Sequence, residues 1–101
     1  MASAAFSPRA RRDLLEAVRW IAADSRSAAQ ALRRSVIEAA DRIGAYPDVG
    51  RGRSELADPP VRFLAMTGFP YVIVYDSGCE PPLILRVLHG ARDLPEVLRD
   101  L

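Results

Sequence analysis

Apolar residues in the last third of the chain fall into three short runs, and turn residues separate one run from the next. Each run is rich in β-branched or aromatic residues and is entered through a proline, which is typical of strands that follow a turn. The pattern therefore predicts three strands, at residues 61–66, Tyr71–Asp76 and Leu83–His89, arranged as an antiparallel meander. The last run continues into a polar cluster, Gly90-Ala91-Arg92-Asp93.

Periodic apolar positions in the first half of the chain predict two helices. Ser7-Pro8 is typical of the start of the first helix, because the serine oxygen accepts an unpaired backbone N–H and proline already has a helical φ. Apolar residues then recur at helical spacing from Ala10 to Ile21, and the helix is expected to end near Asp24.

The second helix is predicted between Ser27, which begins a stretch with capping-box spacing, and Gly44, a typical C-terminal stop. Its apolar stripe consists of Ala28, Ala31, Leu32, Val36, Ala39 and Ile43. So few residues separate the two helices that an antiparallel hairpin is expected. With a weaker strand candidate at residues 2–6, the predicted fold is α+β, a helix hairpin packed on one face of a largely antiparallel sheet.

Alternation along a strand assigns its side chains to the two faces of the sheet. In the last strand, the more apolar face is expected to meet the helices and carries Leu83, Leu85, Val87 and His89. The other face carries Ile84, Arg86 and Leu88, so Arg86 is expected on the open face, beside Arg62 of the first strand. In the middle strand one face carries Tyr71, Ile73 and Tyr75 and the other carries Val72 and Val74. Alternation does not decide which of these two faces meets the helices.

Composition fits one small domain that needs neither a metal nor a cofactor. The 101 residues suffice for a single core, and the formal net charge of +1 argues against a general nucleic-acid coat while leaving room for a local basic patch. No direct sequence-specific DNA binding by this chain is expected. The single Cys79 and the single histidine cannot form an internal disulfide or a zinc site. No apolar run approaches bilayer length and no signal peptide is recognisable, so no membrane contact and a cytoplasmic location are expected.

Four segments carry a combined pattern that spans nearly the whole chain as a single domain. They are residues 6–10 with Asp13-Leu14, residues 43–51, residues 71–75 and residues 84–93. In this order they resemble the RelE/ParE superfamily of bacterial toxins, and the run Arg-Val-Leu-His-Gly-x-Arg-Asp at 86–93 resembles the ParE branch in particular. The resemblance implies a RelE/ParE-like fold and the toxin component of a type II toxin–antitoxin system.

The resemblance also implies partners. ParE-like toxins are associated with poisoning of DNA gyrase, and a cognate antitoxin neutralises them. Such an antitoxin often has a ribbon-helix-helix DNA-binding part, as in ParD-like proteins, and a C-terminal segment that wraps the toxin, so a hetero-oligomer is expected. Two alternatives stay open: a RelE-type ribosome-dependent mRNA endonuclease, and a decayed member that survives only as an antitoxin-bound co-repressor.

The RelE alternative depends on catalytic side chains. RNA cleavage needs a group that takes the 2′-OH proton, cations that hold the phosphorane charge and a donor to the leaving oxygen. RelE-like nucleases usually carry an arginine where this chain has Val72 and a C-terminal tyrosine where it has Leu98, whereas Arg92 is retained. We therefore expect no catalytic residue. If the chain is a nuclease, its set is His89, Arg86 and Arg92.

Eight residues are expected to contact a partner: Leu15, Arg62, Tyr71, Tyr75, Arg86, His89, Arg92 and Leu98. An open sheet edge is a template for strand addition, and Leu15 lies off the main stripe of its helix, so an antitoxin tail is expected to cover both regions. Purely structural roles compete with this expectation: packing for the tyrosines, a bond to the backbone for His89 and a local ion pair for Arg92-Asp93. Residues 50–53, Gly-Arg-Gly-Arg, are interpreted as a flexible loop, since they lack the setting of a phosphate-binding loop.

Overall fold

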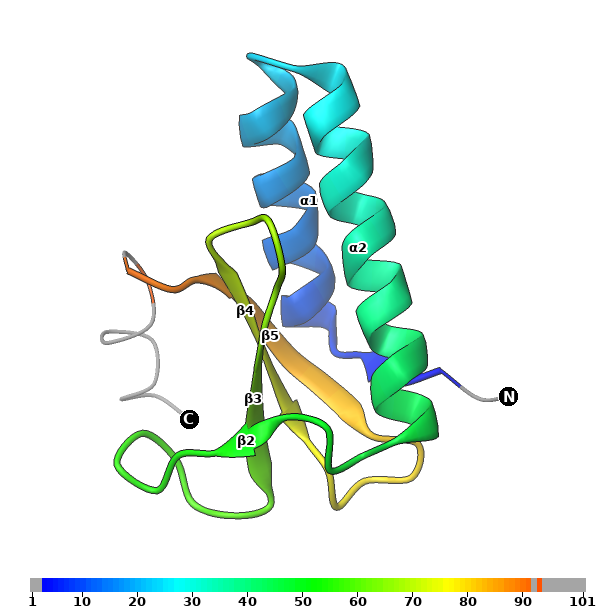
Figure 1. Ribbon diagram of the computed structural model, residues 1–101, viewed down its shortest axis with the longest axis vertical. Coiled ribbons are helices and arrows are strands. Elements are labelled where there is room, and N and C mark those ends of the chain that lie inside the picture. The colour runs from blue at the N-terminus through cyan, green and yellow to red at the C-terminus, as the bar shows by residue number, and fades with distance from the viewer. Residues whose placement is uncertain (1–2, 92, 94–101) are drawn as a thin grey trace.

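Two antiparallel helices lie against one face of a five-stranded mixed sheet in the computed structural model, which describes residues 3–91 and 93 (Figure 1). The elements in chain order are β1 Ala5–Phe6, α1 Pro8–Ala22, α2 Arg26–Ala45, β2 Arg51–Gly52, β3 Val61–Ala65, β4 Tyr71–Asp76 and β5 Leu83–His89. No helix among the described residues is long and apolar enough to cross a membrane.

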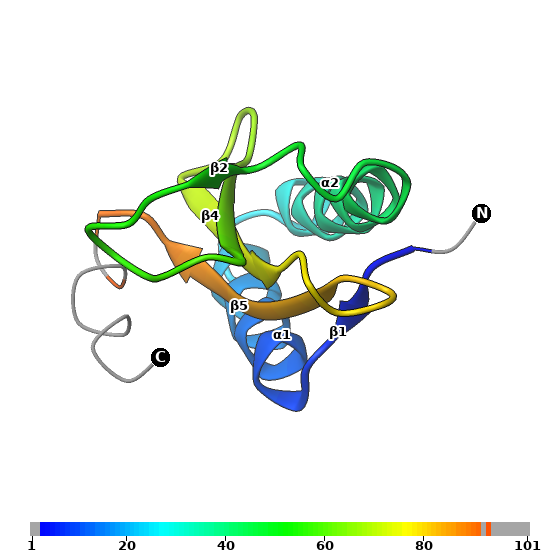
Figure 2. The same ribbon diagram turned by 90° about the horizontal axis from the view of Figure 1, so that it is seen from below.

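The three predicted strands form the middle of the sheet, whose order is β1-β5-β4-β3-β2. β3, β4 and β5 pair as an antiparallel meander, while β1 pairs with β5 in parallel. Figure 2 shows the two short strands β1 and β2 at opposite edges of the sheet. The predicted α+β fold is confirmed, and the strand candidate at residues 2–6 contains the edge strand Ala5–Phe6. One correction concerns the predicted loop at residues 50–53, because its Arg51–Gly52 pairs with β3 as β2.

The ends of the helices follow local capping chemistry. Ser7 caps α1 as predicted: its Oγ accepts the N–H of Ala10 over 3.0 Å and also donates to the carbonyl of Leu85 over 2.9 Å. The predicted cap of α2 is wrong, because Ser25 rather than Ser27 accepts the N–H of Ala28, over 3.1 Å. Ser25 has the extended backbone that an N-cap requires, with φ −155° and ψ 112°, whereas Ser27 already lies inside the helix.

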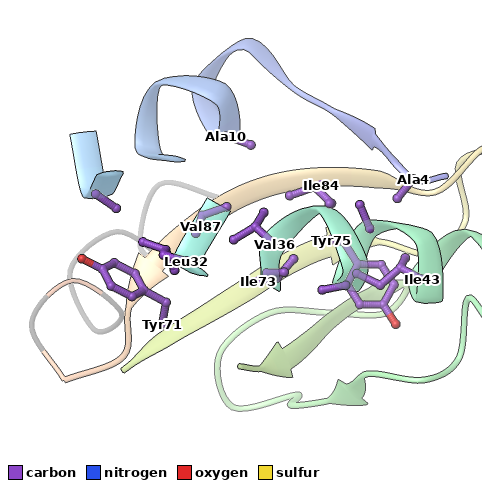
Figure 3. Close-up of a cluster of buried hydrophobic side chains, with 13 residues drawn as sticks. Ala4, Ala10, Leu32, Val36, Ile43, Tyr71, Ile73, Tyr75, Ile84 and Val87 are labelled. Carbon is purple, nitrogen blue, oxygen red and sulfur yellow. The ribbon is translucent and has the colours of Figure 1, made fainter. Parts of the chain in front are cut away.

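The main core lies between the helix hairpin and the sheet. Figure 3 shows the side chains of Tyr71, Ile73 and Tyr75 on the same side of β4 as Leu32 and Val36 of α2. The face of β4 that alternation left unassigned is thereby settled. A second cluster on the opposite face contains Phe63, Val74 and Leu88, and it is covered by Leu56, Ala57, Val61 and Val72.

A bulge in β5 changes which of its residues enter the main core. Arg86 is opposite Val74 and Ile84 is opposite Tyr75, so Leu85 is an extra residue without a partner on β4. The strand therefore does not alternate regularly through this point. Ile84 is fully buried in the main core together with Val87, and the assignment of Leu83 and Leu85 to the helix-facing side is wrong.

Candidate functional site

The carboxylate of Asp13 and the guanidinium of Arg86 join α1 to β5. Arg86 donates from Nε and Nη2 to the two carboxylate oxygens over 2.7 and 3.0 Å, and the N–H of Val87 donates to the same carboxylate over 3.0 Å. The two side chains are nearly buried, with 11% and 12% of their surfaces exposed. The hydrogen bond to Asp13 raises the pKa of Arg86 in spite of burial, and the charges of Asp13, Asp93 and Glu16 add to this effect.

Arg86 is in register with Val74, which belongs to the cluster on the face away from the helices, so its predicted face agrees with the pairing. The predicted exposure and the predicted position beside Arg62 are wrong, because Arg86 is nearly buried and Arg62 is in register with Tyr75. Arg62 instead donates from Nη1 to the carbonyl of Gly50 over 2.8 Å, and its Nη2 lies 3.4 Å from the exposed carboxylate of Asp48. Alternation along the strand could not predict the burial of Arg86, because the carboxylate that pairs with it comes from α1. The bulge precedes Arg86, and a carboxylate of α1 then holds its guanidinium.

Tyr75 connects β4 to the segment that follows α2. Its hydroxyl donates to the carbonyl of Pro47 over 2.6 Å and accepts the N–H of Gly50 over 2.8 Å. The side chain is fully buried, and burial raises the pKa of its phenol. A partner can reach this predicted contact residue only if the segment from Pro47 to Gly50 moves away.

Tyr71 and His89 lie opposite each other where β4 begins and β5 ends. Their ring centroids are 5.6 Å apart and their planes meet at 78°, which is a favourable edge-to-face contact. Tyr71 is buried, and the backbone N–H of His89 donates to Asp93 Oδ2 over 3.2 Å. Contact with a partner stays a prediction for both residues.

The three residues of the nuclease alternative differ in their surroundings. Arg86 has its charge matched by Asp13, and His89 stands at the end of β5. Arg92 and Leu98 lie outside the described residues. Apolar spacing at residues 94–101 predicts a short helix, and this segment also lies outside the described residues. Within the described ranges, no group of three His, Cys, Asp or Glu side chains could hold a metal ion.

A small cavity adjoins the Asp13–Arg86 pair. It has a volume of about 180 Å³ and is lined by Asp13, Glu16, Ala17, Trp20, Tyr71, Val87 and Asp93. Trp20, near the end of α1, is 72% exposed, an unusual state for so large an apolar side chain. The sequence contained a signal for it, because Trp20 lies off the apolar stripe that runs from Ala10 to Ile21.

A larger groove lies on the helix hairpin, and we call it the hairpin groove. Its volume is about 570 Å³ and its lining is Phe6, Arg11, Leu14, Leu15, Val18, Arg33 and Ile37. Leu15 and Ile37 are 48% and 46% exposed, so the expectation that Leu15 lies off the packed stripe is confirmed. The exposure of Ile37 was not predicted. Ile37 directly follows Val36, a member of the apolar stripe of α2, so its side chain points away from the core.

The two edges of the sheet differ in how many of their backbone N–H and C=O groups already have hydrogen-bond partners. Along β5, Ser7 binds the carbonyls of Ile84 and Leu85, while carboxylates of Asp13 and Asp93 accept the next two outward N–H groups. Along β3, the two residues of β2 pair only with Arg62 and Phe63. The edge of β3 beyond Phe63 thus has no strand partner among the described residues, and it borders a cavity of about 250 Å³ against α2.

Comparison with known proteins agrees with this architecture. The family described as "ParE toxin of type II toxin-antitoxin system, parDE" matches residues 4–94. A similar solved structure is the chromosomal ParDE TA system from P. aeruginosa, with a TM-score of 0.70 and 20% sequence identity. That match covers 88% of this chain and 96% of the other chain, and at this identity it shows a shared fold. No curated protein matches the sequence. Since the family match spans nearly the whole chain, this protein belongs to the ParE toxins of type II toxin–antitoxin systems.

Proposed function

We propose that this ParE family member inhibits growth by binding DNA gyrase in the cytoplasm, and that a cognate antitoxin neutralises it. The choice of gyrase rests on the resemblance of residues 86–93 to the ParE branch. Two features favour binding over RNA cleavage. Arg86 is already paired with Asp13, and a paired, nearly buried cation is poorly placed to stabilise a phosphorane. Val72 packs in the apolar cluster around Phe63, where a nuclease needs a cation.

The hairpin groove is the observation that carries the antitoxin part of the proposal. A small domain gains stability when exposed apolar side chains such as Leu15 and Ile37 are covered, and grooves of this kind commonly receive one apolar face of a helix. Arg11 and Arg33 also line the groove, so the complementary helix carries acidic residues along its margins. In our proposal, this helix belongs to the C-terminal segment of a ParD-like ribbon-helix-helix antitoxin. The toxin and the antitoxin then form a hetero-oligomer.

The free part of the β3 edge provides a second contact for the same antitoxin. An extended segment that follows the docked helix adds to the sheet beside Leu64 and Ala65, beyond the residues that β2 covers. The β5 edge is a poorer template, since Ser7, Asp13 and Asp93 already bind its polar groups.

Induction of the chain in cells tests the proposal. Gyrase poisoning predicts double-strand breaks and an SOS response, and co-expression of a small ribbon-helix-helix protein encoded next to this chain restores growth. Ribosome-phased cuts in mRNA without DNA breaks would contradict the proposal and favour the RelE-type endonuclease. Normal growth with soluble, folded chain would also contradict it and favour a co-repressor role.

A further inference from the structure

The cavity at the end of α1 combines an exposed aromatic ring with carboxylates. Trp20 is 72% exposed at one side, and the ring of Tyr71 stands in the wall, held by its edge-to-face contact with His89. Ala17 and Val87 contribute an apolar surface. Exposed tryptophans of this kind are enriched where proteins meet their partners, because a large rigid ring buries much area at little cost in conformational entropy.

The charged side chains that line the cavity, among the residues that the structure describes, are carboxylates. Asp13, Glu16 and Asp93 line it, and all three act on the single guanidinium of Arg86. Arg86 forms its ion pair with Asp13, whereas Glu16 forms no ion pair with any of residues 3–91. The neighbouring arginines of α1, Arg12 and Arg19, are exposed and form no ion pair with Glu16 either. Among the described residues, the carboxylate of Glu16 thus has no ion-pair partner, and it lines the same cavity as the side chain of Trp20.

We propose that this cavity receives an arginine side chain from a protein partner, with the guanidinium stacked on Trp20 and hydrogen-bonded to Glu16. A planar cation matches both features, since it is attracted to the face of an indole ring and donates several N–H groups to a carboxylate. The volume of about 180 Å³ admits one side chain and excludes a folded segment. This inference does not depend on gyrase or on the hairpin groove, which lies elsewhere on the hairpin and is lined by other residues.

The tryptophan itself reports on the cavity, because Trp20 is the only tryptophan in the chain. Titration with N-acetyl-arginine amide is expected to change its fluorescence saturably, with a dissociation constant in the millimolar range. N-acetyl-citrulline amide has nearly the same shape without the charge, and it is expected to bind at least about fivefold more weakly. Far-UV circular dichroism across the titration verifies that the fold is unchanged.

Glu16→Gln is expected to weaken binding of the arginine amide at least about threefold while the fold is retained. Glu38→Gln is the matched control, because Glu38 is exposed on α2 and lines a different cavity. A titration without saturation overturns the proposal. Equal binding of the arginine and citrulline amides, or equal binding by the Glu16→Gln variant and the unchanged chain, also overturns it.

Discussion

Asp13 of α1 holds Arg86 of β5 with two hydrogen bonds, and the same carboxylate accepts the backbone N–H of Val87. The carboxylate of Asp13 thus neutralises a nearly buried cation. It also accepts a backbone N–H of β5 at a point of the strand edge that the short parallel strand β1 does not reach. The pair fixes α1 against the strand end that carries His89. It also removes Arg86 from the cations available to a phosphate.

Removal of one member of this pair is expected to destabilise the fold strongly. Asp13→Ala leaves the guanidinium of Arg86 without its partner and the N–H of Val87 without an acceptor, which costs about 3–5 kcal/mol for a buried pair. Urea unfolding followed by circular dichroism measures the loss. The double variant Asp13→Ala with Arg86→Ala is expected to cost less than the sum of the single changes, by about 1–3 kcal/mol.

The ion pair of Asp48 with Arg62 provides the control. Its nitrogen and oxygen atoms are 3.4 Å apart and the side chain of Asp48 is 85% exposed. Asp48→Ala is therefore expected to change the free energy of unfolding by less than about 1 kcal/mol. Equal effects of Asp13→Ala and Asp48→Ala would contradict the structural role that we assign to the nearly buried pair.

The helix hairpin and the three-stranded meander were predictable because apolar periodicity and capping residues are local signals. The strands Tyr71–Asp76 and Leu83–His89 were predicted to the residue, and Ser7 was recognised as the cap of the first helix. The environment of Arg86 was not predictable in this way. Its position depends on a bulge at Leu85 and on a carboxylate 73 positions earlier in the chain, and neither leaves a periodic signal in the local sequence.

The same distinction applies to the candidate surfaces. Leu15 and Trp20 are visible in the sequence as apolar residues off a helical stripe, and only the first was recognised. Ile37 becomes part of the hairpin groove because the two helices pack side by side, so Leu15 and Arg11 lie across from it. Tyr75 shows the opposite case. It was expected to contact a partner, with packing as the competing role, but in the structure it is fully buried and its hydroxyl is hydrogen-bonded to Pro47 and Gly50.

Gly50 is expected to tolerate no side chain. A Cβ at this position would lie 2.7 Å from Cε1 and 2.8 Å from the hydroxyl oxygen of Tyr75, and 3.0 Å from the carbonyl oxygen of Phe63. Gly50→Ala is therefore expected to lower the free energy of unfolding by about 1–3 kcal/mol through overpacking. Gly52→Ala is the matched control, since a Cβ there meets nothing within 4 Å. Similar unfolding midpoints in urea for the two variants would refute the close packing of Gly50 on Tyr75.

The phenol of Tyr75 is expected to make stability depend on alkaline pH. Burial raises its pKa in the folded state above the ordinary value of 10.0. The folded chain therefore holds the phenolic proton more tightly than the unfolded chain does. The contribution is fully present below the unfolded pKa and is lost as the pH rises from there through the folded pKa.

Unfolding in urea at a series of pH values from neutral to strongly alkaline measures this dependence. Tyr75→Phe is expected to flatten the alkaline decline, and to cost about 1–3 kcal/mol at neutral pH because the N–H of Gly50 loses its acceptor. Tyr46→Phe serves as the control, since Tyr46 is exposed. An alkaline decline that is unchanged in Tyr75→Phe would show that another group causes it.

The hairpin groove is expected to dominate the affinity for the antitoxin. Leu15→Ala and Ile37→Ala each remove an exposed apolar side chain that the partner covers, so each is expected to weaken binding about tenfold, or about 1.4 kcal/mol. Isothermal titration calorimetry with the C-terminal segment of the neighbouring ribbon-helix-helix protein measures this loss. Stability is expected to remain close to that of the unchanged chain, because both side chains are about half exposed before binding.

Val49→Ala is the control that distinguishes an effect at the hairpin groove from a general effect of removing exposed apolar surface. Val49 is also an exposed apolar residue, but it follows α2 and does not line the groove. Its truncation is therefore expected to leave the affinity unchanged. In cells, the groove variants are expected to remain toxic and to need more antitoxin for rescue, since our proposal assigns the groove to the antitoxin and not to the target. Equal weakening by all three substitutions would mean that the antitoxin does not dock in the groove, and loss of toxicity in the groove variants would instead place the target contact there.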